Sequence, residues 1–381
     1  MSDINVILIS SVRPAPTTAA AMTFHRLLVN QSGTHLTILP AEYAEIAPKS
    51  LWVKLIARLS RTRFARLAAS ADFLLHAFLP VGSQLPPPTT PKKNTLVLSL
   101  AARNGCWVAA RYAKQHGLPL VVRFDDWWPD CDAVNPWLNG LLQRQFVALH
   151  RAAKVSICIS AGMKSALPSH ANAPIILPIP EAGKASASIP PGDIPPFRIC
   201  YLGNMYDYGP MLADLARRLM SQNLMRLEFR GPEPRWPAEL KQEMRAKGLL
   251  HGFASGSDFD RWFEGFHAYL VVMFFEPEQR RRVETCFATK LAEYTALGRP
   301  IVIWAPESSS VAQWARQTNG ALCVTNSNPD VLIRELIALA NDTQRQATLG
   351  AAARRAYESE FNPDILQRNF IEALASAFKS N

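Results

Sequence analysis

The sequence lacks several features that would place it in familiar classes of protein. It has no run of about 18 consecutive apolar residues, and no basic segment precedes an apolar one at its N-terminus. We therefore expect neither a membrane-spanning helix nor a secretory signal. No Cys-x-x-Cys pair occurs among the six cysteines, and several of them lie inside apolar runs. This pattern indicates buried, reduced thiols in a cytoplasmic protein without a structural zinc site.

Acidic residues are too few to balance the basic ones. The chain has 41 Lys and Arg against 31 Asp and Glu, a formal net charge of +10. Such an excess fits an anionic partner: phosphates, nucleic acid, anionic lipid or an acidic sugar. The positive charge is concentrated in one amphipathic segment and short clusters, and no nucleic-acid-binding motif is present, so we do not expect nucleic acid as the partner.

Short apolar runs alternate with helical patterns along most of the chain, which predicts an α/β protein with parallel sheets. The rhythm breaks at 181–196, a stretch rich in Pro, Ala, Ser and Gly. We expect an N-terminal Rossmann-like domain at 1–180, a linker at 181–196, a second Rossmann-like domain at 197–361 and a terminal helix at 362–381. Ligands bind at the carboxyl ends of parallel strands, so the two domains are expected to face a common cleft.

A basic amphipathic segment at 51–67 stands apart from this alternation. It has no acidic residue, and it carries Lys54, Arg58, Arg61, Arg63 and Arg66 beside tryptophan, leucine and phenylalanine side chains. The pattern has two interpretations: a surface helix packed on the first sheet, or a helix that contacts an anionic membrane.

Two carboxylates, Asp125 and Asp126, follow an apolar run that ends at Phe124. A carboxylate at the end of a rigid strand can act as the general base that takes a proton from a hydroxyl group. The alternative is a helix cap ahead of the Trp-Trp-Pro turn. Asp130 and Asp132 spell Asp-x-Asp shortly afterwards, in the first expected domain.

Gly203 and Asn204 lie between the first strand of the second domain and its following helix. Free backbone N–H groups at a helix N-terminus bind phosphate, and a plain turn is the alternative. Further on, Lys290 and Glu293 lie three residues apart and share a helix face. We expect Lys290 to meet a diphosphate and Glu293 to accept hydrogen bonds from ribose hydroxyls, with a surface ion pair as the alternative.

The segment Lys-Leu-x-Glu-Tyr-x-Ala-x-Gly-x-Pro-Ile-Val, which begins at Lys290, resembles the donor-binding helix of GT-B glycosyltransferases of the broad group 1 type. In that family two glutamates are separated by seven residues, whereas eight separate Glu284 from Glu293 here. The usual Arg and Lys of the Gly-Asn loop are also missing. We expect the remaining phosphate or sugar contacts at Arg13, Arg230, Arg282 and Glu284.

In these departures from the family pattern, the sequence resembles the xanthan-type inverting glucuronosyltransferase. The resemblance rests on Gly203 and Met205 after a strand. It also rests on a lysine, Lys290, three residues before a polar residue that Tyr294 follows, and on an aromatic, Phe275, fifteen residues before that lysine. It also includes an Asp three residues after an Arg on a strand. The resemblance implies Asp126 as the base, and Met205 and Phe275 near the donor.

These patterns together predict a GT-B glycosyltransferase whose last helix crosses back to the first domain. The expected reaction moves a sugar from a UDP- or GDP-linked donor to a hydroxyl of a glycan or lipid-linked acceptor, as in bacterial-type polysaccharide assembly. Neither a cofactor nor a metal is expected, and the enzyme would be peripheral at the cytoplasmic face of a membrane. The alternatives are a nucleotide-sugar epimerase or hydrolase, or a non-catalytic module that binds a nucleotide sugar.

Overall fold

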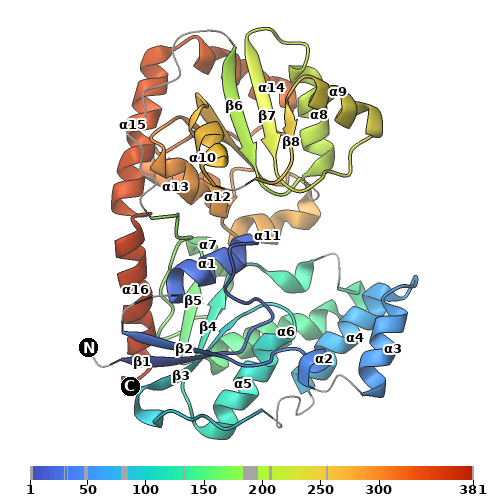
Figure 1. The fold of residues 1–381 in the computed structure, drawn as a ribbon, viewed down its shortest axis with the longest axis vertical. Helices are drawn as coiled ribbons and strands as arrows, with labels where there is room; N and C mark the ends of the chain where they lie inside the picture. The colour runs from blue at the N-terminus through green and yellow to red at the C-terminus, as the bar shows by residue number, and fades with distance from the viewer. Residues whose placement is uncertain are drawn as a thin grey trace. The chain divides into compact units, whose positions relative to one another are not determined.

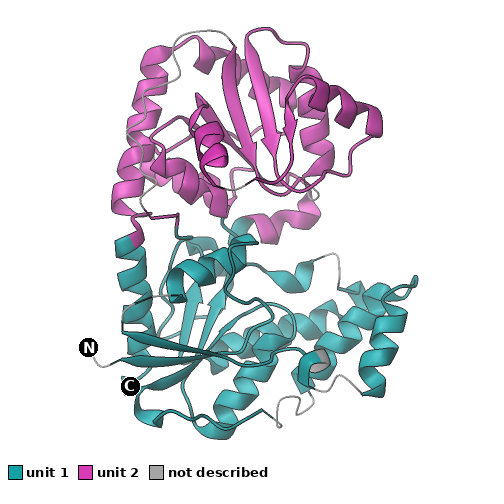
Figure 2. Ribbon diagram, viewed as in Figure 1, with its two compact units in different colours: residues 1–179, 284–287, 364–381 teal, residues 180–283, 288–363 magenta. Residues whose placement is uncertain are grey.

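The computed structural model describes residues 3–29, 31, 33–46, 50–78, 85–131, 134–182, 196–205, 208–254 and 256–379. The chain divides into two units, which Figure 2 colours separately. Unit 1 comprises residues 1–179, 284–287 and 364–381, and unit 2 comprises 180–283 and 288–363. The short segment 284–287 therefore interrupts the continuous second domain that we expected. Most of the expected linker, 183–195, lies outside the described residues.

Unit 1 contains a parallel five-stranded sheet in the order β2-β1-β3-β4-β5 (Figure 1). Its strands are β1 (Ile4–Leu8), β2 (Thr34–Ile38), β3 (Thr95–Leu100), β4 (Leu120–Phe124) and β5 (Val155–Cys158). Every residue of β3, β4 and β5 is buried. This burial explains their continuous apolar runs, since parallel strands covered on both faces do not alternate between apolar and polar residues.

The helices of unit 1 connect these strands. They are α1 (Ala19–Leu28), α2 (Tyr43–Ile46), α3 (Leu51–Leu59), α4 (Ala65–Phe78), α5 (Gly105–His116), α6 (Pro136–Ala152), α7 (Ala161–Ala166) and α16 (Pro363–Ser376), with 3₁₀ turns at Lys92–Asn94 and Trp128–Asp130. Their ends follow the local sequence. The Asn135 side chain caps α6 by accepting from the Trp137 N–H, and Gly117 ends α5 in the left-handed conformation.

The last helix, α16, belongs to the core of unit 1 although it follows unit 2 in the sequence. Leu366, Phe370 and Leu374 recur every four residues along one face of the helix and are buried. They pack in the same apolar cluster as Val6 of β1 and Leu98 of β3. The expected return of the terminal helix to the first domain is confirmed.

The basic segment 51–67 forms two helices rather than one. α3 ends at Leu59 and α4 begins at Ala65. In the turn between them, the Ser60 hydroxyl donates to the Ala57 carbonyl and the Thr62 hydroxyl donates to the Leu59 carbonyl. Hydroxyl groups that bond nearby carbonyls compete with helical hydrogen bonds, which explains the break.

Unit 2 contains a parallel six-stranded sheet in the order β11-β10-β9-β6-β7-β8 (Figure 1). Its strands are β6 (Phe197–Leu202), β7 (Met225–Arg230), β8 (Leu250–His251), β9 (Ala268–Val272), β10 (Ile301–Trp304) and β11 (Leu322–Val324). The strand order of both units reverses direction once, between β1 and β3 in unit 1 and between β6 and β9 in unit 2. Both sheets therefore have the doubly wound topology expected from the alternating pattern.

The helices of unit 2 pack around this sheet. They are α8 (Gly209–Leu219), α9 (Ala238–Ala246), α10 (Ser257–Glu264), α11 (Arg280–Thr285), α12 (Thr289–Ala296), α13 (Ser310–Thr318), α14 (Pro329–Ala340) and α15 (Thr343–Ser359), with a 3₁₀ turn at Pro277–Gln279. The last two residues of α11 belong to unit 1. Within the described residues of the whole chain, no helix is both long enough and apolar enough to cross a bilayer.

Candidate active site

The strand order of unit 2 defines where a ligand can approach its sheet. The connections on the two sides of the β6–β9 pair run to opposite faces, so the loops that leave the carboxyl ends of these strands diverge. Ligands of doubly wound sheets bind in the crevice that this divergence opens. Predicted donor residues lie in the loops on both sides of the switch point between β6 and β9. The loop after β6 contains Gly203, Asn204 and Met205, and the loop after β9 contains Phe275.

The loop after β6 is held close to the loop after β7. The Gly203 N–H donates to the Arg230 carbonyl over 2.9 Å. A Cβ atom added at Gly231 would lie 2.2 Å from the Gly203 carbonyl oxygen, so only glycine fits there. Gly203 itself has a φ of 122°, which a residue with a side chain rarely adopts. Met205 is fully buried in the apolar core of unit 2 and anchors the loop there, whereas Asn204 is exposed.

Lys290, in the first turn of α12, lies against this loop. Its Nζ atom is 4.0 Å from the centroid of the Tyr201 ring, and a Cβ atom added at Gly203 would lie 3.4 Å from Nζ. Burial lowers the pKa of Lys290 to about 7. At physiological pH the Lys290 amine is therefore partly neutral. An anion bound beside it would favour the protonated form, so the amine would take up a proton.

Glu293 and Tyr294 lie one turn further along α12 and serve different purposes. The Glu293 carboxylate is half-buried, and its Oε2 atom accepts from the Glu181 N–H over 3.3 Å. Tyr294 is fully buried: its ring lies 4.8 Å from the Tyr269 ring, and its hydroxyl accepts from the Leu202 N–H over 3.0 Å. Tyr294 therefore fixes α12 against the end of β6, and Glu293 is the more accessible of the two side chains.

The other predicted donor residues of unit 2 are held by aromatic rings. Phe275 is half-buried beside the Trp304 ring, with 5.7 Å between the centroids. The Arg230 guanidinium lies over the Trp262 ring at 4.2 Å and donates to the Gly252 carbonyl. The guanidinium of Arg282 lies 5.3 Å from the Phe274 ring.

The predicted catalytic carboxylates lie in unit 1, at the carboxyl end of β4. Asp126 is exposed, whereas the Asp125 side chain is only 12% exposed and its Oδ1 atom lies 2.7 Å from Nε of the fully buried Arg123. Burial raises the pKa of Asp125, repulsion from Asp126 adds to that rise, and the Arg123 guanidinium opposes it. Asp125 is therefore fixed in an ion pair, and Asp126 is the carboxylate of the two that a substrate can reach.

Two further predicted residues, Arg13 and Glu284, also belong to unit 1. Arg13 follows β1 and forms an ion pair with Glu45, whose carboxylate also accepts from the Ala41 N–H. Glu284 lies in the segment 284–287. Its carbonyl oxygen packs so closely on Gly162 that a Cβ atom there would lie 1.8 Å away. Neither residue belongs to the cluster of donor residues in unit 2.

Three contributors to these sites were not predicted as site residues. The Tyr201 ring lies beside the Lys290 amine, and Gly231 lacks the Cβ atom that would collide with the Gly203 carbonyl. Arg123 forms an ion pair with Asp125. Gly231 carried a signal, because glycine directly after a buried strand often marks a close approach of two backbones. A tyrosine or an arginine inside an apolar strand carries no signal of its partner.

Comparisons with known proteins show which solved structures share this fold. No protein-family model matches the sequence, and no curated protein sequence matches it. Among solved structures, Anabaena HepE in complex with UDP-glucose matches with a TM-score of 0.63 at 14% identity, over 98% of this chain and 100% of that one. A UDP-forming α,α-trehalose-phosphate synthase from Burkholderia xenovorans, in complex with glucose-6-phosphate, matches with a TM-score of 0.61 at 12% identity, over 98% and 100%.

A third match comes from a fungus. The N-terminal domain of Candida albicans trehalose-6-phosphate phosphatase has a TM-score of 0.63 at 9% identity, with 98% of this chain and 97% of that one covered. At such identities the likeness concerns the fold alone. The chain has the GT-B fold: two Rossmann-like units, with the last helix returned to the first.

Proposed function

We propose that this chain is a glycosyltransferase that moves a sugar from a nucleoside diphosphate sugar to a hydroxyl group of an acceptor. One observation carries the proposal: Lys290 lies against the Gly203 loop at the switch point of the unit 2 sheet. This arrangement combines a cation, a glycine whose backbone a phosphate can approach, and a sheet edge at which nucleotides bind. Glu293, one turn further along α12, supplies a carboxylate for the ribose hydroxyls.

The reaction divides between the two units. In unit 1, Asp126 accepts the proton of the acceptor hydroxyl, and the oxygen forms a bond to the anomeric carbon of the donor sugar. The bond from that carbon to the diphosphate oxygen breaks, and the electron pair leaves with the nucleoside diphosphate. Lys290 in unit 2, protonated beside the diphosphate, stabilises the charge that develops there.

The solved structures favour a hexosyl donor linked to uridine diphosphate. HepE was solved with UDP-glucose, and the Burkholderia synthase is UDP-forming. Neither of them is described as a glucuronosyltransferase, so transfer of glucuronic acid rests on the sequence resemblance alone. A GDP-linked donor is the alternative that a binding assay separates directly.

The acceptor is proposed to be a glycan or a lipid-linked sugar at the cytoplasmic face of a membrane. α3 supports this part of the proposal, because none of its residues is buried and Leu51 and Leu55 are exposed beside Lys54 and Arg58. Exposed leucines next to basic residues favour the surface of an anionic bilayer. All six cysteines are free thiols, as is usual in a reducing compartment.

A titration with UDP-glucose and GDP-glucose, followed by calorimetry, tests the donor site. Lys290→Ala is expected to weaken UDP-glucose binding by about tenfold or more, because a charge-assisted contact to phosphate contributes roughly 1.5–3 kcal/mol. Lys247→Ala, which removes an exposed lysine of unit 2, is the matched control and should bind as the wild type does. If the protein binds neither UDP-glucose nor GDP-glucose, the assignment of the donor site is refuted.

A transfer assay tests the base. Asp126→Asn should abolish transfer and leave the affinity for UDP-glucose unchanged, while Asp3→Asn, an exposed aspartate of the same unit, should alter neither. Release of UDP in the absence of any acceptor, unaffected by added glycans, would instead indicate a hydrolase. Donor binding without any turnover would indicate a non-catalytic module.

A further inference from the structure

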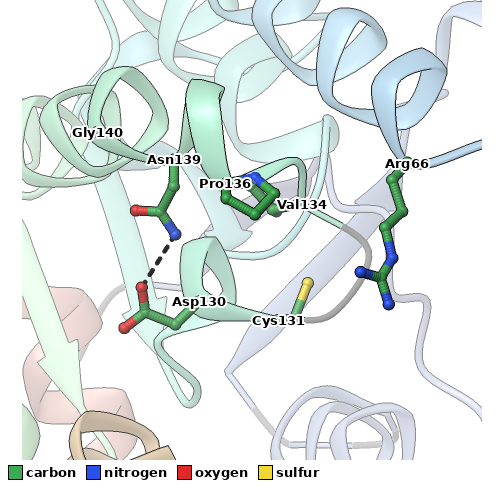
Figure 3. A pocket seen from close by; sticks show the side chains of 7 residues that line it. All are labelled: Arg66, Asp130, Cys131, Val134, Pro136, Asn139 and Gly140. Atoms are coloured by element: carbon green, nitrogen blue, oxygen red, sulfur yellow. Dashed lines mark hydrogen bonds between the residues drawn. The ribbon is translucent and has the colours of Figure 1, made fainter. Parts of the chain in front are cut away.

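Unit 1 contains a cavity whose lining residues have no role in the reaction as proposed above. Its volume is about 350 Å³, and its wall is formed by the start of α4, the turn after β4 and the start of α6. The residues that line it are Arg66, Asp130, Cys131, Val134, Pro136, Asn139 and Gly140. Figure 3 shows Asp130 and Asn139 on one side, Arg66 on the other and Cys131 between them.

Hydrogen bonds fix the wall of this cavity. The buried Ser70 hydroxyl donates to the Arg66 carbonyl and accepts from the Asn135 N–H, so it ties α4 to the cap of α6. On the other side the Asp130 carboxylate accepts from the side-chain amides of Asn139 and Gln143. The Asp130 and Asn139 side chains are therefore positioned before a ligand arrives, which lowers the entropic cost of binding to this side of the cavity.

The chemistry of the wall is mixed. The Arg66 side chain is exposed, and its guanidinium makes neither an ion pair nor a hydrogen bond with any residue in the described part of the chain. Across the cavity, Asn139 donates to the Pro129 carbonyl and to Asp130, which leaves its own carbonyl oxygen as an acceptor. A ligand that complements both sides has an anionic group for Arg66 and hydroxyl groups for the oxygens of Asn139 and Asp130.

We propose that this cavity binds the acceptor, in the form of one saccharide unit that carries a phosphate or carboxylate group. The inference rests on the proposed glycosyltransferase function and names its acceptor class. The volume is at the lower end of the range for small-molecule sites, so it suits a single sugar residue. The turn that contributes Asp130 and Cys131 begins directly after Asp125 and Asp126, so the cavity and the proposed base belong to one stretch of chain.

Cys131 makes a test possible that does not depend on activity. Its thiol is half-buried in the cavity wall, so a bound saccharide should shield it from alkylation by N-ethylmaleimide. The rate is followed by mass spectrometry of the Cys131 peptide in the full-length protein, with Cys286 as the internal control. The probes are glucose 1-phosphate, glucuronate, glucose and inorganic phosphate, each without nucleotide.

Glucose 1-phosphate, glucuronate or both should slow the alkylation of Cys131 by about tenfold at ten times their dissociation constant, because the rate follows the unoccupied fraction. Which of them protects separates the phosphate source of the negative charge from the carboxylate source. Arg66→Ala should remove this protection. Arg63→Ala removes the same charge three residues earlier, outside the cavity wall, and should keep it. Equal protection by glucose or by inorganic phosphate, no protection by any probe, or unchanged protection in Arg66→Ala would each overturn the proposal.

The transfer reaction separates this proposal from the function on which it rests. Once an acceptor is found, Arg66→Ala should raise the KM for that acceptor while the affinity for UDP-glucose stays at the wild-type value. If the protein binds neither UDP-glucose nor GDP-glucose but a saccharide still protects Cys131, the glycosyltransferase function is refuted and the saccharide site is retained. Donor binding with no protection would do the reverse.

Discussion

Lys290 combines two properties that a single titration can reveal: a neighbouring loop suited to phosphate and a pKa of about 7. A diphosphate favours the charged amine, so binding above pH 7 should take up a proton. We expect the dissociation constant for UDP to rise with pH from 7 to 9, approaching tenfold per unit. Calorimetry at pH 8 in two buffers of different ionisation enthalpy measures the uptake directly. An affinity that stays constant over this range would contradict the assignment of Lys290.

The same pKa shift has a consequence for stability in the absence of ligand. The folded pKa lies below the ordinary value of 10.5, so between pH 7 and that value the unfolded chain binds a proton that the folded chain does not. The contribution of Lys290 to the free energy of unfolding therefore increases with pH across this window. Lys290→Met, which cannot titrate, should lose this slope and should gain most over the wild type below pH 7.

The Arg123–Asp125 ion pair is an example of a side-chain contact that cannot be predicted from the sequence. The apolar run around Arg123 predicts a buried strand, and the two aspartates after it predict a carboxylate at the strand end. The pattern does not reveal that Asp125 is fixed by the buried guanidinium while Asp126 reaches solvent. The ion pair depends on side-chain directions at the strand end, which sequence spacing does not determine.

At the scale of elements, the contact between the loops after β6 and β7 can be tested by adding one methyl group. In Gly231→Ala the new Cβ would meet the Gly203 carbonyl at 2.2 Å, so the β6 loop must move. We expect a loss of about 1–3 kcal/mol in the free energy of unfolding, as for other overpacked sites, together with weaker UDP binding.

Gly252→Ala is the matched control for this change. No atom lies within 4 Å of the position that its Cβ would take, although Gly252 also follows a strand of unit 2. Chemical denaturation and UDP titration of both variants give the comparison. Equal affinities in Gly231→Ala and Gly252→Ala would separate the Gly203 loop from the donor site.

The basic face of α3 predicts salt-dependent attachment to anionic vesicles. Each basic residue near such a surface contributes about 1 kcal/mol. Reversing Lys54 and Arg58 of α3, and Arg61 of the turn that follows it, to glutamate should therefore lower vesicle partitioning by at least about a hundredfold. Sedimentation with phosphatidylglycerol vesicles, and with phosphatidylcholine alone, measures it.

The control for the vesicle experiment reverses the same number of charges elsewhere. Arg217, Arg334 and Arg355 are exposed residues of unit 2, and their replacement by glutamate changes the net charge equally. If this control lowers partitioning as much as the α3 variant does, the attraction depends on net charge and not on the amphipathic segment.

The elements themselves were largely accessible to prediction, whereas their contacts were not. Alternating apolar runs and helical patterns predict two parallel sheets, and Lys290 and Glu293 are found on one helix as their spacing requires. The break at Ser60 and the burial of Tyr294 depend on competing hydrogen bonds and on packing. The attachment of 284–287 to unit 1, through the Ser160 hydroxyl and the Thr285 carbonyl, depends on residues far apart in the sequence.

At the scale of the molecule, α16 makes the stability of unit 1 depend on the end of the chain. Phe370→Ala should cost about 3–5 kcal/mol, as for other buried aromatic residues, and should reduce hydrogen-exchange protection in β1 and β3. Glu372→Ala, on the exposed face of the same helix, should stay within about 0.5 kcal/mol of the wild type. Loss of protection in β6 and β9 to the same degree would show that the two cores unfold together.

The chain passes between its two units four times, at 179/180, 283/284, 287/288 and 363/364. A single exchange of sequence between two such proteins therefore cannot deliver one complete unit. A fusion at 179/180, for example, leaves the first unit with a last helix and a segment 284–287 inherited from the other parent. Exchanging unit 2, the proposed donor-binding unit, would need matched joints at 179/180, on both sides of 284–287 and ahead of α16. Specificity in this protein is thus easier to alter by point changes than by exchanging modules.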